Sequence, residues 1–182
     1  MEMIHALCCS LLPVAAFAQS LARRAHALMG TWRLVEFADL DKDGKWHYRF
    51  GEHPRGYFVY DATGHVHIQI MKVPPPVPFP EANAVVGKPP SAEHALAAYA
   101  AYFAYFGTYT VDAKKQVVTH HVEGSLAPEF TDTDQPRPFK LEGDRLEIGD
   151  GKTWRRRLER VRGSMSTSTE EPVRTRRDAG TR

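Results

Sequence analysis

Apolar and polar positions alternate most regularly in the middle of the chain. In His65-Val-His-Ile-Gln-Ile-Met71, three aliphatic residues occupy every second position, and histidine, amide and thioether side chains occupy the others. An aromatic and β-branched run, Arg55–Tyr60, lies just before it, and Asp61–Gly64 between the two has turn composition. Two short strands joined by a glycine-containing turn predict a β-hairpin.

The same period of two predicts further strands on both sides of this hairpin. Two lie before it, over 31–37 and 46–50. Two more hairpins follow, over 107–112 with 116–123 and over 137–141 with 145–148, and a last strand covers 153–161.

One segment between these strands has a helical rather than a strand pattern. Ser91 is suited to cap a helix, and the alanine-rich stretch 92–106 carries one aromatic and aliphatic face, formed by Leu96, Tyr99, Phe103 and Phe106. We expect Gly107 to end this helix. The prolines of Val73–Pro80 cannot donate to a sheet ladder, so a long loop is expected before the helix.

About eight to ten short strands, mostly joined by tight turns, with one inserted amphipathic helix predict a mainly β fold. The arrangement expected is a closed antiparallel β-barrel, because closure leaves no exposed sheet edge. A length of 182 residues suits one such domain.

Composition and the two termini narrow the function classes. A net charge of +2 is too small to indicate nucleic-acid binding. The apolar segment Ile4–Ala18, with small residues before Gln19, predicts a signal peptide 1–18 and a secreted or periplasmic protein, and it is too short for a membrane span. The barrel domain is then 19–161, and 162–182 has the composition of a disordered tail.

Both cysteines, Cys8 and Cys9, lie inside the predicted signal peptide. The processed chain would therefore contain no disulfide, no thiolate metal site and no cysteine nucleophile.

Several short segments resemble, in order, the lipocalin-like domain family of bacterial and fungal proteins, which is related to the calycins. They span the chain from Met29 to about Val161 and comprise Gly30–Leu34, Arg55–Tyr60 with Gly64, Tyr105–Tyr109, His120-His121, Ser125-Leu126, Pro128–Phe130, Asp134-Gln135 with Arg137, and the turn from Leu141 to Leu146. The resemblance implies a lipocalin-type β-barrel with an interior cavity. It implies no particular activity, because a shared fold does not carry function with it. The loop at 73–80 is longer than the family usually has.

Trp32 and the histidines are the first candidates for special roles. Trp32 is expected to close one end of the barrel under a cation from a late strand, Arg137 or Arg156, or alternatively to form part of a ligand pocket. His65 and His67 share a strand face and could, with a third histidine, hold a metal ion. Because no carboxylate is fixed beside them by spacing, we assign no metal site and no cofactor.

A catalytic interpretation is also open. His121 with Glu123, or His67, could act as general base in a small isomerase or cyclase, since imidazole titrates near neutral pH. No nucleophile elbow, P-loop or dinucleotide fingerprint accompanies these residues.

The plainest interpretation is that the barrel binds a small, mostly hydrophobic molecule in its interior. A barrel filled by its own side chains is the structural alternative. The expected partner is this small molecule, without nucleic acid or membrane span, and the protein is expected to be a monomer or homodimer. The predicted ligand-binding residues are Trp32, Tyr57, Tyr60, His67, Met71, Tyr99, Tyr109, His121 and Arg137.

Overall fold

A computed structural model describes residues 26–78 and 89–163 of the chain. The hairpin predicted around Asp61–Gly64 is present as β3 (Arg55–Tyr60) and β4 (His65–Met71). The Asp61 carboxylate accepts hydrogen bonds from the backbone amides of Thr63 and His65, which fixes the turn between the two strands. The predicted signal peptide lies outside the described residues, as does nearly all of the predicted tail, and export stays a prediction.

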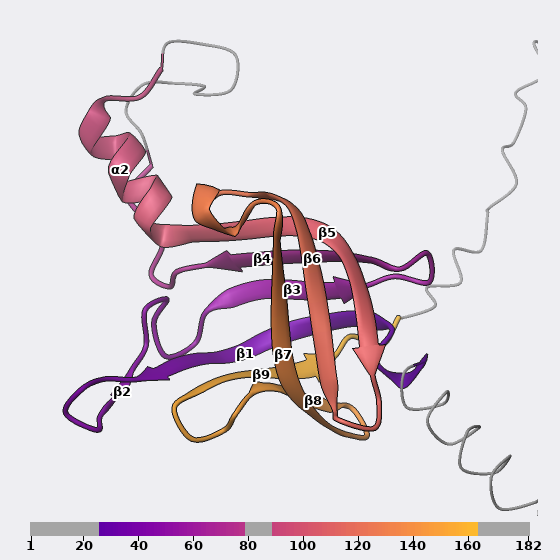
Figure 1. Ribbon diagram of the computed structural model, residues 1–182. Helices are drawn as coiled ribbons and strands as arrows, with labels where there is room; N and C mark the ends of the chain where they lie inside the picture. Colours follow the sequence, from indigo (N-terminus) through magenta and orange to yellow (C-terminus); the bar gives the residue numbers. More distant parts are fainter. Residues whose placement is uncertain (1–25, 79–88, 164–182) are drawn as a thin grey trace, which may run out of the picture.

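The remaining strands extend this hairpin on both sides into one antiparallel sheet. Its order is β2-β1-β3-β4-β5-β6-β7-β8-β9, and β1 also pairs with β9. Eight strands therefore close into a barrel, with short β2 added at the end of β1 (Figure 1). The predicted closed antiparallel barrel is confirmed. The other strands are β1 (Gly30–Leu40), β2 (Trp46–His47), β5 (Tyr102–Asp112), β6 (Val117–Ser125), β7 (Thr133–Glu142), β8 (Arg145–Gly149) and β9 (Trp154–Arg160).

The helix α2 (Ala92–Ala101) is shorter than predicted. Its N-cap is Ser91, whose hydroxyl accepts a hydrogen bond from the backbone amide of His94. The expectation that it continues to Phe106 is wrong, because 102–106 pairs along β4 as the first part of β5. Phe103 and Tyr105 face the core with a period of two, and this alternation prevails over the helical spacing of Leu96, Tyr99, Phe103 and Phe106.

The predicted strand over 46–50 is also mostly wrong, since only Trp46 and His47 pair with β1. The chain then turns at Gly51, which has φ +84° and donates its amide hydrogen to the Tyr48 carbonyl. This turn directs Phe50 into the core, where its ring meets Phe37 edge-on at 4.9 Å.

One end of the barrel is closed by Trp32, which is fully buried. Its indole nitrogen donates to the Leu28 carbonyl at 2.8 Å, and the Arg160 guanidinium lies 4.0 Å from its ring centre. A cation from a late strand was expected at this position, but Arg160 occupies it and not Arg137 or Arg156. Arg160 also donates to the Met29 and Ala27 carbonyls, so it ties the segment before β1 to the barrel.

Candidate functional site

A cavity of about 260 Å³ occupies the other, open half of the barrel. Its walls are mostly aromatic and aliphatic, and its polar side chains come mainly from β5, β6, β7 and β9, with Asp39, Arg49 and Glu129 in addition. The apolar lining includes Phe37, Phe50, Phe58, Ile68, Ile70, Phe103, Phe130 and Ile148, and the polar lining includes Tyr105, His120, Arg137 and Arg156. The volume lies just below the ~300–1,000 Å³ typical of small-molecule pockets.

His120 is the central polar group of the interior and is fully buried. Its Nε2 lies 2.9 Å from the Tyr60 hydroxyl, and its Nδ1 lies 2.7 Å from the Tyr105 hydroxyl. Strands β3, β5 and β6 thus each contribute one member of a Tyr60–His120–Tyr105 chain. Both ring nitrogens are satisfied by these contacts, as burial requires.

Burial keeps the side chains of Tyr60, His120 and Tyr105 uncharged. The pKa of His120 is lowered to about 3, mainly because burial penalises the imidazolium and also because Arg137 and His121 add positive charge nearby. Burial raises the pKa of Tyr105 to about 12 and that of Tyr60 well above its usual value. A neutral imidazole between two neutral phenols is therefore the state present near pH 7.

The direction of the hydrogen bonds follows from the fully buried Tyr60. Among the described residues, His120 is the hydrogen-bond partner of the Tyr60 hydroxyl, so Tyr60 donates to Nε2. The imidazole proton is then on Nδ1 and is donated to the Tyr105 oxygen. The hydroxyl hydrogen of Tyr105 therefore has no acceptor among these three side chains, and Tyr105 lines the cavity.

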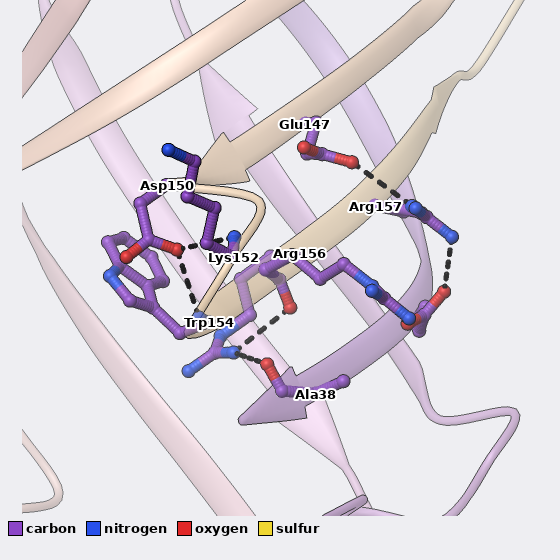
Figure 2. Close-up of polar contacts among 9 residues, drawn as sticks. Ala38, Glu147, Asp150, Lys152, Trp154, Arg156 and Arg157 are labelled. Atoms are coloured by element: carbon purple, nitrogen blue, oxygen red, sulfur yellow. Dashed lines mark hydrogen bonds and ion pairs between the residues drawn. The ribbon is translucent and has the colours of Figure 1, made fainter. Parts of the chain in front are cut away.

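Two partly buried arginines, Arg137 and Arg156, bring positive charge into the cavity. Arg156 lies 3.3 Å from the centre of the Phe37 ring and donates to the Ala38 carbonyl and to the Asp39 carboxylate, each at 2.8 Å. Figure 2 shows this contact with Ala38 beside the neighbouring Arg157, which reaches out of the barrel wall to Glu147 on β8. Arg156 is thus held in place and neutralised by its own carboxylate.

Arg137 is held differently. One of its terminal nitrogens donates to the Gln135 amide oxygen at 3.0 Å, and its guanidinium lies 5.4 Å from the Trp154 ring centre. No carboxylate in the described part of the chain forms an ion pair with it. Its charge and hydrogen bonding act on Tyr105, where they oppose the rise in pKa that burial causes.

An apolar groove of about 630 Å³ lies against the open end of the barrel, between α2 and the proline-rich loop. Its walls include Met71, the Pro75–Pro78 segment and the alanine face of α2. Tyr99, Tyr102 and Leu126 line both this groove and the cavity. The two spaces are therefore adjacent, and together they form a continuous apolar surface that ends at the polar groups inside.

Four of the predicted ligand-binding residues lie at this end of the barrel or directly behind the cavity. Arg137 and Tyr99 line the cavity, Met71 lines the groove, and Tyr60 is bonded to the cavity residue His120. Trp32 and Tyr109 belong to the closed half, where the Tyr109 ring packs on Tyr60 at 5.1 Å between ring centres.

The other three predicted residues lie on the outside of the barrel. Tyr57 is 47% exposed, and His67 points outward because its neighbours Val66 and Ile68 are the core residues of β4. His121 bonds the Asp134 carboxylate at 2.6 Å and the Thr110 hydroxyl at 3.1 Å on the outer surface. The expectation that His67 and His121 face a shared interior is wrong, because the aliphatic residues next to them in the strands take the inward positions.

Sequence reasoning missed His120 and Tyr105. The signal for His120 was present: Val118 and Val122 lie two positions away on either side, so an inward apolar face of β6 includes position 120 and excludes 121. The expected helix over 92–106 includes Tyr105, so the sequence pattern does not predict that this side chain faces the interior from β5.

The described residues contain no group of three histidine, cysteine or acidic side chains placed to hold a metal ion. Within the same residues, no helix has the length and apolar character needed to cross a bilayer.

An eight-stranded antiparallel barrel with an interior cavity at one end is the architecture of small ligand-binding β-barrels. A family model described as a lipocalin-like domain matches residues 29–167, and the chain belongs to that family. No curated protein matches the chain.

Proposed function

We propose that this protein binds a small, mostly apolar molecule in the cavity at the open end of its barrel. The observation that carries the proposal is the combination of an aromatic and aliphatic wall with a few buried or partly buried polar groups, among them His120, Tyr105 and Arg137. Such a lining removes the apolar part of a ligand from water while the polar groups fix its orientation.

The two alternatives have less support. A barrel filled entirely by its own side chains does not account for about 260 Å³ of space between the strands. An isomerase with a histidine base needs an available imidazole, but His67 and His121 face outward. His120 is bonded at both nitrogens, and its pKa of about 3 makes it a weak base near pH 7.

The binding proposal is tested by titrating the protein with the neutral lipophilic probe N-phenyl-1-naphthylamine. Trp154 lines the cavity whereas Trp32 lies at the closed end, so binding should change the fluorescence of Trp154. We expect a saturable change in the wild type and in Trp46→Phe, and its loss in Trp154→Phe. Native mass spectrometry of freshly purified protein should also show a bound lipophilic molecule.

Two matched substitutions, each replacing a nearly buried alanine by phenylalanine, locate the site. Ala127 borders the cavity and Ala113 lies in the turn between β5 and β6, and both are nearly buried. Ala127→Phe should occupy part of the cavity and weaken probe binding about tenfold, whereas Ala113→Phe should leave it within about twofold. Absence of saturable binding across a broad panel of lipophiles, or equal weakening by both variants, would contradict the proposal.

A further inference from the structure

We propose that the ligand of this cavity carries a carboxylate, which is bound by the guanidinium of Arg137 and the hydroxyl of Tyr105, with its apolar part directed toward the groove. This inference rests on the proposed binding function and names the chemical class of the ligand.

Charge is the first reason. Three arginines line the cavity, Arg49, Arg137 and Arg156, against two carboxylates, Asp39 and Glu129. Asp39 is bonded to Arg156, and both Glu129 and Arg49 are exposed at the rim. The partly buried cation of Arg137 thus has no carboxylate partner within the described chain, and removing a charge from water without a partner is costly.

Unused hydrogen-bond donors are the second reason. Gln135 accepts from one terminal nitrogen of Arg137, and a second guanidinium N–H interacts with Tyr105. The remaining N–H groups, of five in all, are available at the cavity. The hydrogen-bond directions in the Tyr60–His120–Tyr105 chain leave the Tyr105 hydroxyl hydrogen without an acceptor inside that chain. A planar carboxylate accepts from both groups at once, and hydrogen bonds between charged partners are the strong ones.

The position of Arg137 along its strand sets the orientation of the ligand. On β7 the inward residues run from Thr133 and Gln135 near the open end, through Arg137, to Phe139 in the buried core. The acid group would therefore lie deep in the cavity. The apolar part would extend past Tyr99 and Leu126, which line both the cavity and the groove.

The test compares ligands that differ only in the acid group. Binding of decanoate, methyl decanoate and 1-decanol is measured by isothermal titration calorimetry at pH 7.5 and checked by the fluorescence of Trp154. In the wild type we expect decanoate to bind at least about tenfold more tightly than either neutral analogue, as one charge-assisted contact allows.

Substitutions then assign the contact. Arg137→Gln should reduce the preference for decanoate to about threefold or less while methyl decanoate binds as in the wild type, which also shows that the variant is folded. Arg137→Lys, which keeps the charge, should retain part of the preference, and Tyr105→Phe should lower it several-fold. Arg55→Gln is the matched control, because it removes an exposed arginine of β3 that does not line the cavity, and it should leave the preference unchanged.

Three outcomes would overturn the inference, and they are distinguishable. If the acid and its neutral analogues bind equally in the wild type, the proposed binding function is retained, but the inference that the ligand carries a carboxylate is wrong. If Arg137→Gln retains the tenfold preference, or Arg55→Gln removes it, the anchor is not Arg137. If none of the three ligands binds, and the lipophile panel also fails, the proposed function falls as well.

Discussion

His120 shows how much a single residue can depend on its place in the barrel. In the unfolded chain its imidazole titrates near pH 6.5, whereas burial lowers its pKa to about 3 in the folded protein. Between these two values the unfolded state binds a proton that the folded state does not. The contribution of His120 to the free energy of unfolding is therefore complete above about pH 6.5. It is lost progressively as the pH is lowered from 6.5 towards 3.

This predicts a loss of about 2 kcal/mol in the free energy of unfolding between pH 7 and pH 5 from this one group. Urea denaturation at several pH values measures it. In His120→Gln the amide can still accept from Tyr60 and donate to Tyr105, but the titrating group is gone, so the pH dependence should become shallower by that amount. The control His53→Gln, at an exposed histidine, should keep the wild-type dependence. Parallel curves for all three proteins would contradict the assignment.

Residue identity alone could not tell which of His120 and His121 faces inward. Both belong to the same strand, and adjacent side chains in a strand point to opposite faces. The spacing of Val118 and Val122 indicates position 120, yet a buried histidine is acceptable only if partners reach both its nitrogens. Those partners, Tyr60 and Tyr105, come from strands distant in sequence, and nothing local in the sequence indicates them.

Among the elements, β5 carries the largest difference between sequence and structure. Its first half was predicted as helix and Gly107 as the residue that ends it, whereas Gly107 lies inside the strand at a bulge opposite β6. The two backbones approach so closely there that a Cβ on Gly107 would be 2.0 Å from the His121 carbonyl oxygen and 2.9 Å from the Glu123 nitrogen.

Gly107→Ala is therefore expected to lower the free energy of unfolding by about 3 kcal/mol, because backbone atoms and not flexible side chains must move. Gly44→Ala provides the comparison. Gly44 has φ +74° but nothing within 4 Å of the added carbon, so only the left-handed conformation is penalised, by about 1 kcal/mol. Urea or thermal unfolding of both variants measures the difference. Equal costs would show that the bulge can widen without penalty.

The hairpins were predicted well because their signals are local. Turn residues at 61–64 and alternating residues on both sides specify β3 and β4 without help from the rest of the chain. The end of α2 was not, because Phe103 and Phe106 continue the helical spacing of the preceding residues, whereas Phe103 and Tyr105 alternate as in a strand. Pairing of β5 with the edge of β4 decides between the two, and that contact is tertiary.

For the whole molecule, closure depends on the longest-range pairing in the barrel, that of β1 with β9. The number and type of strands predicted a closed barrel correctly. The alternation of residues did not indicate which residues of the first and last strands would pair to close it. The closing seam is irregular, with a bulge between Leu34 and Glu36. Glu36 sits at this bulge and accepts from Arg155 at 2.7 Å and from Arg157 at 3.0 Å, both on β9.

The Glu36–Arg155 pair is well shielded, since both side chains are only 14% exposed. Arg155 also lies 3.8 Å from the centre of the Trp46 ring, so it cannot turn to solvent without losing that contact. Removing the carboxylate charge leaves a partly buried guanidinium unpaired at the closing seam. Glu36→Gln should consequently lower the free energy of unfolding by about 2 kcal/mol in urea denaturation.

The control for this last prediction lies on the same pair of strands. Glu159 pairs with Arg33 at 2.6 Å, but these side chains are 49% and 59% exposed. Glu159→Gln should therefore cost less than about 1 kcal/mol, because water and salt screen an exposed pair. If both substitutions cost the same, the ion pairs at Glu36 would contribute no more than an ordinary surface pair, and apolar packing between β1 and β9 would have to hold the barrel closed.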